Sequence, residues 1–324
     1  MAEALLQARN VTVSFGPPQA RLRAVDSVSL DVRAGETLGI VGESGSGKST
    51  LGLALLGMAP DAEDSRIDGA ITFDGRDLLR LSPRELSAVR GRDLSMILQD
   101  PMTSLNPVLR VGTQVAETFG ADRRSSRRVG ERVEDLLRAV GIASPSDRAR
   151  AFPHMLSGGM KQRVVGAIAL SSNPRLLIAD EPTTSLDPTV QVAFLDWLKG
   201  VQRARGMALV IVTHDFGVVA KMCDRVAVMY AGEIVETAPV RDIFRRPAHW
   251  YTRALIDSVP TLAKPTQRLS AIAGAPPRID ARPSGCRFAP RCPKAQPACE
   301  KPPTPTALSV DRSVLCRFPI EVGA

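Results

Sequence analysis

The sequence predicts an α/β fold, in which short buried strands end in polar loops. A glycine-rich loop at residues 42–49 stands between an apolar run at 38–41 and a helix-like segment at 50–56, which is the order strand, turn, helix. Two further apolar runs, at 176–179 and 208–212, also end in polar residues. Continuous apolar runs of this length are typical of strands buried in a parallel sheet.

Length and composition agree with this fold class and add a second region. The chain has 324 residues, of which 44% are hydrophobic and 23% are charged, so it can bury a large core. Between residues 260 and 319 lie 12 of the 25 prolines, which predicts an irregular extension rather than more sheet. We find no internal repeat of the glycine-rich region, so one chain supplies one copy of it.

The sequence shows no secretory or membrane-spanning segment. Residues 1–7 do not combine a basic region with a following apolar stretch, so we expect no secretory signal. No window approaches the roughly 18 consecutive apolar residues that a membrane helix needs. We therefore expect a chain that works in the cytoplasm.

The formal net charge of +8 raises nucleic acid as a candidate partner. The basic run of Arg123, Arg124, Arg127 and Arg128 is more typical of a solvated helix face, and no aromatic residues interleave with it. With nine Phe, two Tyr and two Trp in all, a base-stacking platform has little support. We expect no nucleic-acid partner, and a basic face beside anionic lipid fits the charge equally well.

The glycine-rich loop matches the phosphate-binding pattern G-x-x-x-x-G-K-S/T without a mismatch. In such loops backbone N–H groups converge on phosphate oxygens at a helix N-terminus, a role that favours glycine. Lys48 is placed to reach the β- and γ-phosphates, and the Ser49 hydroxyl to bind Mg²⁺. The alternative is a glycine turn that binds nothing. The predicted set comprises Gly42, Glu43, Ser44, Gly45, Ser46, Gly47, Lys48, Ser49 and Thr50.

Polar groups follow the two later apolar runs. Asp180 and Glu181 end the first, at the strand edge where ligands gather in open α/β sheets. There Asp180 can hold a metal through water, and Glu181 can act as the general base toward water. His214 ends the second run and reaches the same edge. A solvated charge for Glu181 and a structural role for His214 are the alternatives.

The octapeptide LSGGMKQR at residues 156–163 lies between the phosphate loop and the acidic pair, and Ser157 within it is a good helix cap. The order of these three motifs resembles that of the ATP-binding subunit of an ABC transporter. The resemblance covers essentially the whole chain. It implies an ATP hydrolase with a P-loop ABC ATPase core, a mixed sheet and a helical signature subdomain.

In the family that the chain resembles, the octapeptide faces the γ-phosphate held by a second subunit. One copy per chain therefore implies a second ABC ATPase subunit, which by family habit is a related paralogue. Two subunits then enclose two ATP molecules head to tail, and we expect ATP to close this dimer and hydrolysis to reopen it. The residues implied to contact ATP in trans are Ser157, Gly158, Gly159, Gln162 and, in the loop 185–187, Asp187. An ordinary Asp-Pro turn is the alternative for that loop.

The resemblance assigns further roles. His214 matches the switch histidine, and Gln99 matches the glutamine that touches Mg²⁺ and the attacking water. Phe15 matches the aromatic residue that stacks on adenine, although the alternation at residues 11, 13 and 15 equally predicts a core side chain. The implied catalytic residues are Glu181, His214 and Gln99, and the implied Mg²⁺ ligands are Ser49, Gln99 and Asp180.

The motifs divide the chain near residue 240. Residues 1–240 carry every nucleotide motif and form the predicted ATPase domain, with a helical insertion at about 92–163. Residues 241–324 form the predicted extension. It holds four of the five cysteines, while Cys223 lies before it and is expected to be a small core residue.

The four cysteines of the extension are Cys286, Cys292, Cys299 and Cys316. In a cytosolic chain such a cluster favours a metal over disulfides. Basic neighbours lower thiol pKa values and favour thiolate ligands, and Lys and Arg outnumber acids around these cysteines. The spacing lacks the C-x₂-C pairs of common zinc ribbons.

Residues 285–293 resemble the C-terminal extension of oligopeptide and dipeptide importer ATPases, some of which carry a [4Fe–4S] cluster. The resemblance implies such a cluster on the four cysteines, with zinc or reduced thiols as alternatives. Residues 99–107 and 247–252 resemble the same group, although Trp250 replaces its usual proline and leaves the local turn open.

The resemblance thus implies an ATPase subunit that powers import of oligopeptides or dipeptides. Two membrane permease subunits and an external substrate-binding protein are the implied partners, and the cytoplasmic face of the plasma membrane is the implied location. Nickel and oligosaccharide importer ATPases are similar. A soluble ABC ATPase without a membrane partner is the competing class, and a binding-only module is disfavoured because Gln99, Glu181 and His214 are all present.

Overall fold

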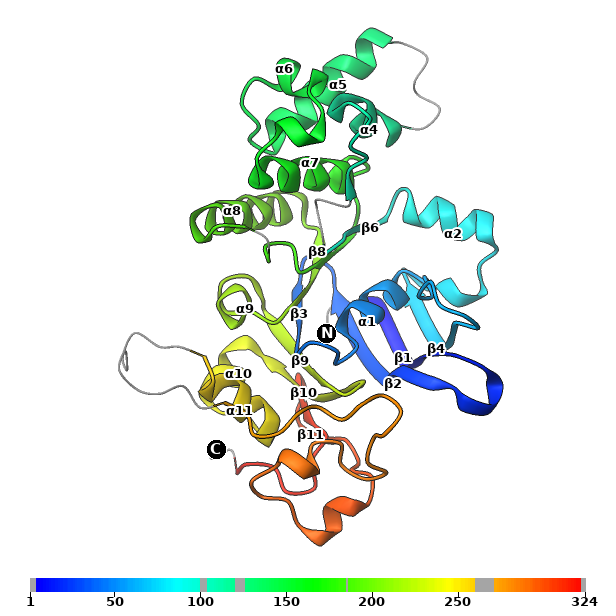
Figure 1. The fold of residues 1–324 in the computed structure, drawn as a ribbon, viewed down its shortest axis with the longest axis vertical. Coiled ribbons are helices and arrows are strands. Elements are labelled where there is room, and N and C mark those ends of the chain that lie inside the picture. Colours follow the sequence, from blue (N-terminus) through cyan, green and yellow to red (C-terminus); the bar gives the residue numbers. More distant parts are fainter. Residues whose placement is uncertain (1–3, 100–103, 120–125, 185, 260–270, 322–324) are drawn as a thin grey trace. The chain divides into compact units, whose positions relative to one another are not determined.

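A computed structural model describes residues 4–99, 104–119, 126–184, 186–259 and 271–321 (Figure 1). The chain falls into two compact units, which we call the phosphate-loop unit and the signature unit after the motifs they contain. The phosphate-loop unit comprises Ala4–Val32, Thr37–Arg80 and Val212–Ala324. The signature unit includes Arg33–Glu36 and Leu81–Ile211.

The phosphate-loop unit contains an antiparallel sheet in the order β2-β1-β4-β5. β1 and β4 pair with a shift in register between Arg9 and Thr12. In the second half of β2 the buried residues Val28, Leu30 and Val32 alternate with more exposed ones, as expected for a sheet with one covered face. The strands are β1 (Ala4–Phe15), β2 (Leu22–Arg33), β4 (Arg66–Phe73) and β5 (Arg76–Asp77).

A second run of strands in this unit has the order β11-β12-β10-β9-β3. β3 pairs parallel with β9, whereas β10 pairs antiparallel with both β9 and β12. Every residue of β3 and β9 is buried, which explains their mostly apolar sequences. The strands are β3 (Thr37–Val41), β9 (Arg225–Tyr230), β10 (Glu233–Pro239), β11 (Thr306–Ser309) and β12 (Arg312–Val314).

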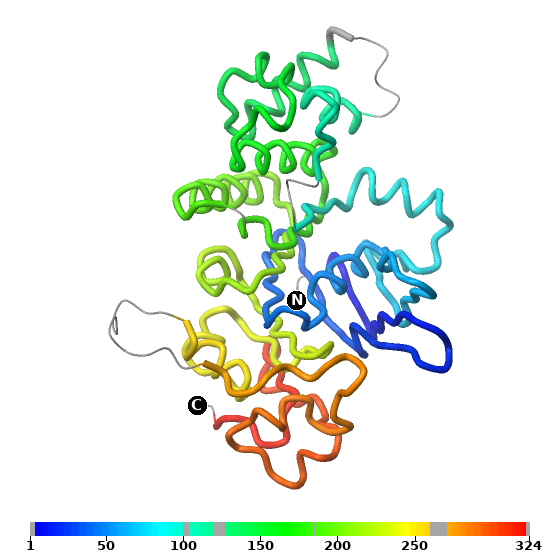
Figure 2. Tube along the Cα trace, in the orientation of Figure 1, coloured from blue at the N-terminus to red at the C-terminus, as the bar shows by residue number. Residues whose placement is uncertain are grey.

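Helices connect these strands, and the C-terminal extension returns to them. Figure 2 follows residues 271–321 from orange to red, through irregular chain, to β12 beside β10. Residues 271–321 are thus mainly irregular, as expected from their prolines, but they also contribute the two short strands β11 and β12. The helices of this unit are α1 (Lys48–Leu55), α9 (Phe216–Met222), α10 (Val240–Arg245) and α11 (Trp250–Asp257). Its 3-10 turns are η1 (Pro18–Ala20), η2 (Leu78–Arg80), η5 (Ala289–Arg291) and η6 (Pro297–Glu300).

The signature unit combines strands in the order β8-β7-β6 with a group of helices. β6 and β7 pair in parallel, and α4, α5 and α7 contact one another (Figure 1). Its strands are β6 (Leu94–Ile97), β7 (Leu176–Asp180) and β8 (Ala208–Thr213). Its helices are α2 (Pro83–Arg90), α4 (Val111–Glu117), α5 (Ser126–Ala139), α6 (Pro145–Arg150), the 3-10 turn η4 (Pro153–Met155), α7 (Gly158–Leu170) and α8 (Pro188–Arg205). Within the described ranges, no helix combines the length and apolar character of a membrane span.

Candidate functional site

The phosphate loop runs from the end of β3 to the start of α1, and two of its glycines fit only because they lack a side chain. A Cβ on Gly42 would lie 2.1 Å from the Met229 carbonyl oxygen of β9. A Cβ on Gly47 would lie 2.5 Å from the Ala24 carbonyl oxygen of β2, and Gly47 has a left-handed φ of 101°. The loop therefore turns tightly against two neighbouring strands.

We call the N-terminus of α1 open because no side-chain hydrogen bond caps it. Gly47 caps it without a side-chain hydrogen bond, so no side chain at the cap satisfies the first N–H groups of the helix. The Ser46 hydroxyl is buried and lacks a hydrogen-bond partner among the described residues. The Lys48 amine folds back and donates to the carbonyl oxygens of Gly42 and Glu43, each at 2.8 Å. These donors suit the phosphates of a nucleotide.

The acidic pair lies in the signature unit, at the C-terminal end of a strand that is buried throughout. Asp180 is the last residue of β7 and is 4% exposed. Glu181 adopts a left-handed backbone with φ of 43°, which is uncommon outside glycine. The Thr184 hydroxyl donates to the Glu181 carboxylate at 2.7 Å. A strained residue held by its neighbours is a feature that clusters at active sites.

Gln99 and His214 also follow strands. Gln99 is exposed just after β6, in the signature unit, and residues 100–103 that continue its motif lie outside the described chain. His214 is exposed directly after β8, in the phosphate-loop unit. It precedes Asp215, which caps α9 by accepting hydrogen bonds from two backbone N–H groups.

The octapeptide begins α7, as its cap residue predicts. The Ser157 hydroxyl accepts a hydrogen bond from the Met160 N–H at 3.3 Å, and both Ser157 and Gly158 are exposed. A Cβ on Gly159 would lie 2.5 Å from Val190 of α8, so glycine permits the close packing of α7 on α8. Gln162 is 1% exposed, and neither its nitrogen nor its oxygen has a hydrogen-bond partner within the described chain.

Two further predicted residues are accessible at the ends of elements. Phe15 ends β1 and is half-buried, whereas Val11 and Val13 before it are fully buried. Asp187 is exposed at the start of α8 and makes no side-chain capping bond there. Ser185 and the pair Arg123-Arg124 lie outside the described residues.

Comparison with known proteins decides the family. The ABC transporter family matches residues 25–184, and the family "Oligopeptide/dipeptide transporter, C-terminal region" matches residues 235–299. The dipeptide transport ATP-binding protein DppD of Bacillus subtilis (strain 168) is 44% identical over 97% of this chain and 94% of its own length. The oligopeptide transport ATP-binding protein OppD of Salmonella typhimurium is 44% identical over 99% of this chain and 95% of its own length.

The chain belongs to the ABC transporter family. Among solved structures, the dimeric MJ0796, described as a bacterial ABC transporter cassette, matches with a TM-score of 0.64 and 28% identity. That match covers 73% of this chain and 99% of the cassette. The chain is an ABC ATPase of the oligopeptide and dipeptide transporter group.

In this ABC ATPase the four cysteines of the extension border a common cavity. Cys286, Cys292, Cys299 and Cys316 line one cavity, together with side chains that include His249, Trp250 and Phe288. All four are free thiols. Within the described chain, no group of three or more His, Cys, Asp or Glu side chains is arranged to hold a metal ion.

The expectation that basic neighbours lower the thiol pKa values is wrong for three of the cysteines. Burial raises the pKa of Cys286 and of Cys292, and it raises that of Cys316 to about 11. Negative charge on the neighbouring thiols adds to each rise. Three nearby arginines, Arg282, Arg287 and Arg291, are not among the residues that line the cavity and pair instead with other parts of the unit.

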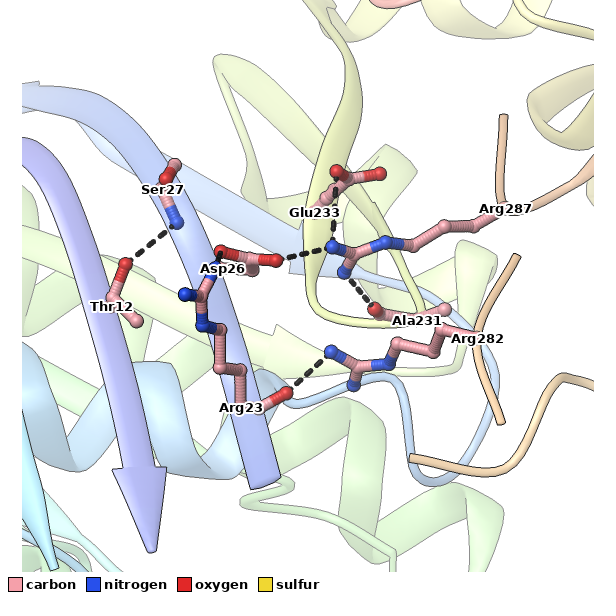
Figure 3. A network of polar contacts seen from close by, with 8 residues as sticks. All are labelled: Thr12, Arg23, Asp26, Ser27, Ala231, Glu233, Arg282 and Arg287. Carbon is pink, nitrogen blue, oxygen red and sulfur yellow. Dashed lines mark hydrogen bonds and ion pairs between the residues drawn. The ribbon is translucent and has the colours of Figure 1, made fainter. Parts of the chain in front are cut away.

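Two of these arginines anchor the extension to strands (Figure 3). Arg287 donates to the Ala231 carbonyl oxygen at 2.6 Å and forms ion pairs with Asp26 of β2 and Glu233 of β10. Arg282 donates to the carbonyl oxygen of Arg23 in β2. Because these contacts join residues more than 50 positions apart, the extension is an integral part of the phosphate-loop unit.

The structure also gives Trp250 a position. His249 caps α11 by accepting a hydrogen bond from the Tyr251 N–H at 3.0 Å, which makes Trp250 the first helical residue. Proline is favoured at that position, and Trp250 keeps the turn without it. Its indole N–H donates to the Phe318 carbonyl oxygen at 3.0 Å, so it ties α11 to the end of the extension.

Sequence reasoning missed two residues that contact the phosphate loop, Arg291 and Tyr251. Arg291, between two of the cysteines, pairs with Glu43 of the loop. Tyr251 also contacts Glu43, through the backbone N–H of that residue. No short motif marks these contacts, because the partners lie more than 200 residues apart in sequence.

Proposed function

We propose that the chain hydrolyses ATP to energise the import of oligopeptides or dipeptides through a membrane permease complex. One observation carries this proposal: the ABC transporter match at 25–184 and the peptide-transporter C-terminal match at 235–299 occur in one chain. Relatives with both regions are named as dipeptide or oligopeptide transport ATP-binding proteins over nearly the full length. The cargo itself is chosen by other subunits.

We propose that ATP binds the residues 42–50, with Phe15 against the adenine and Mg²⁺ on Ser49, Gln99 and Asp180. Glu181 then activates the attacking water, and Gln99 and His214 complete the catalytic set. The open N-terminus of α1 and the buried Ser46 hydroxyl support the phosphate assignment. The left-handed backbone at Glu181 supports its catalytic role. In domain terms, residues 1–240, with the insertion at about 92–163, form the ATPase, and residues 241–324 form the extension.

The proposed working unit is an ATPase dimer on the cytoplasmic face of the plasma membrane. Ser157, Gly158, Gly159, Gln162 and Asp187 meet the ATP held by the second ATPase, for which a related paralogue is proposed. Exposure of Ser157, Gly158 and Asp187 supports this assignment. Two permease subunits and an external substrate-binding protein complete the complex.

We also propose that the extension binds a [4Fe–4S] cluster through Cys286, Cys292, Cys299 and Cys316, with zinc as the alternative. The support is that four free thiols line one cavity, since all-cysteine ligation suits such clusters. A bound cluster would join the distant parts of the extension through iron–thiolate bonds. Raised thiol pKa values mean that metal binding must displace protons.

The function is tested by ATP hydrolysis of the anaerobically purified chain, alone and with its candidate second ATPase and membrane subunits in liposomes. Stimulation by the membrane subunits is expected, and the Glu181→Gln chain in the same vesicles serves as the inactive control. Vigorous hydrolysis that is indifferent to the membrane subunits would instead favour a soluble ABC ATPase.

A further inference from the structure

Glu43, the second residue of the phosphate loop, is held by three groups at once. Its carboxylate accepts two hydrogen bonds from Arg291, at 2.6 and 3.0 Å. Its backbone N–H donates to the Tyr251 hydroxyl at 2.8 Å, and its carbonyl oxygen accepts from the Lys48 amine at 2.8 Å. A shift of Glu43 would therefore move the carbonyl oxygen that accepts a hydrogen bond from the Lys48 amine.

Arg291 is well placed to fix Glu43. Its side chain is 4% exposed, and its guanidinium meets the carboxylate through two parallel bonds, the strongest and most directional form of such a pair. Tyr230 supports it, because the Tyr230 hydroxyl accepts from Arg291 at 3.3 Å and the guanidinium carbon lies 5.8 Å from the ring centroid. From the other side, Arg291 Nε donates to the Ala273 carbonyl oxygen at 2.9 Å.

The backbone that carries Arg291 lies beside the cysteine cavity. Arg291 ends the 3-10 turn η5, between Phe288 and Cys292, both of which line the cavity. The Phe288 ring is 1% exposed and packs edge-on against Tyr230, with centroids 5.4 Å apart. Its centroid also lies 5.3 Å from that of the Tyr251 ring, and the Tyr251 hydroxyl is the group that accepts from the Glu43 N–H.

Attachment of the extension does not depend on Arg291. Arg282 and Arg287 reach strands β2 and β10 and the turn at Ala231, and β12 pairs with β10. The bond from Arg291 instead ends on the phosphate loop. Its loss would free the Glu43 carboxylate without releasing the extension, and would leave the Glu43 backbone held only by Tyr251 and Lys48.

We propose that Arg291 is a positioning residue for the phosphate loop, acting through Glu43, and that the cysteine-bearing extension thereby sets the loop geometry for ATP. This proposal rests on the proposed role of the phosphate loop in ATP binding. It makes the extension part of the nucleotide site, although none of its residues needs to touch ATP.

The test compares full-length, anaerobically purified chains that carry Arg291→Gln, Arg291→Lys or Glu43→Gln. The dissociation constant for Mg-ATP is measured by titration, and kcat and KM are measured in the assembled ATPase complex. Arg291→Gln is expected to lower kcat/KM by about 10- to 100-fold, the cost of a misplaced binding group. The loss should fall mainly on KM and on ATP affinity, because ground state and transition state share the loop.

Matched variants separate positioning from stability. Arg278→Gln removes an arginine that is 82% exposed and pairs with Asp280 in the same extension, and it should leave ATP affinity unchanged. Arg291→Lys keeps the charge but not the paired bonds, so it should recover part of the affinity. The double variant Glu43→Gln with Arg291→Gln should be no worse than the poorer single variant, since both remove one interaction.

Unchanged ATP affinity in Arg291→Gln would overturn the proposal. A lower kcat at wild-type KM, together with a lower melting temperature, would assign Arg291 a purely structural role and would overturn it too. If Arg291→Gln does not fold, Glu43→Gln and Arg291→Lys decide in the same assays. Failure of the wild type to bind Mg-ATP would refute the loop assignment itself, and absence of peptide uptake would refute only the transport proposal.

Discussion

Glycines of the phosphate loop carry two separate constraints, one on backbone conformation and one on space. Gly47 has both, with a left-handed φ of 101° and the Ala24 carbonyl 2.5 Å from where a Cβ would lie. Gly45 has only the first, since its φ is 77° and nothing lies within 4 Å of a Cβ there. The two positions therefore offer a matched pair.

We predict that Gly47→Ala destabilises the chain by about 2–4 kcal/mol, from left-handed strain plus a clash with backbone. Gly45→Ala should cost only about 1–2 kcal/mol, from the strain alone. Denaturant unfolding monitored by fluorescence measures both. Equal midpoints for the two variants would contradict the close approach of the loop to β2.

At Glu181 we predict a loss of hydrolysis without a loss of binding. Glu181→Gln keeps the size of the side chain but removes the base, so ATP turnover should fall by about 10²- to 10⁴-fold. The variant should accumulate as an ATP-bound dimer, which light scattering can measure in the presence of Mg-ATP. An oligomer distribution that ATP leaves unchanged would contradict the sandwich dimer.

The role of a single residue could be predicted from the sequence only where its partners lie close to it along the chain. The sequence indicated a strand, a glycine loop and a helix because these are contiguous, and the structure has β3 and α1 on either side of that loop. It did not reveal the pairing of Glu43 with Arg291, which are 248 positions apart. It also predicted the wrong pKa direction for Cys286, Cys292 and Cys316, because charge composition does not show which arginines pair elsewhere.

Among the elements, α7 and α2 begin in the same way and can be compared. Ser157 caps α7 with its hydroxyl. Ser82 caps α2 in the same way, and its backbone N–H also donates to the Glu85 carboxylate. Loss of either cap removes a hydrogen bond to a helix N-terminus. Only Ser157 is also proposed to contact ATP in trans.

We predict that Ser157→Ala and Ser82→Ala each lower the free energy of unfolding by about 1 kcal/mol. Hydrolysis in the assembled complex should fall strongly in Ser157→Ala and remain near wild type in Ser82→Ala. Thermal melts and steady-state turnover of the same samples provide both readouts. Equal turnover in the two variants would contradict the proposed contact of Ser157 with ATP and would leave it only the role of a helix cap.

Strands were predictable where burial dictates an apolar run. The runs at 176–179 and 208–212 correspond to β7 and β8, both buried along their whole length. β11 gave no such signal, since all four of its residues are exposed and it follows a proline-rich stretch. It pairs with β12, which pairs with β10, so its existence depends on tertiary contacts that periodicity does not reveal.

At the scale of the whole molecule, the extension contains a cysteine-lined cavity and also contacts the strands and the phosphate loop of the phosphate-loop unit. The cavity draws its thiols from residues 286–316, while Cys223 lies elsewhere and is 6% exposed, as expected for a core residue. A bound cluster would therefore depend on the four cavity cysteines and not on Cys223.

We predict that anaerobically purified wild type shows a broad absorption near 400 nm, roughly where thiolate-bound iron absorbs. Cys292→Ser should abolish that band, because one of four ligands is lost, whereas Cys223→Ala should retain it. Absorption spectra and metal analysis of the three proteins check this. A colourless wild type that contains zinc would end the iron assignment.

The central claim is that ATP hydrolysis by this chain drives peptides across a membrane. Its most direct test is uptake of a labelled peptide into vesicles that hold the permease subunits and both ATPases, with the binding protein on the opposite side from ATP. Uptake that requires Mg-ATP, fails with ADP and is lost with Glu181→Gln is the predicted result. ATP hydrolysis that proceeds in those vesicles while no peptide enters, across a panel of di- and oligopeptides, would contradict it.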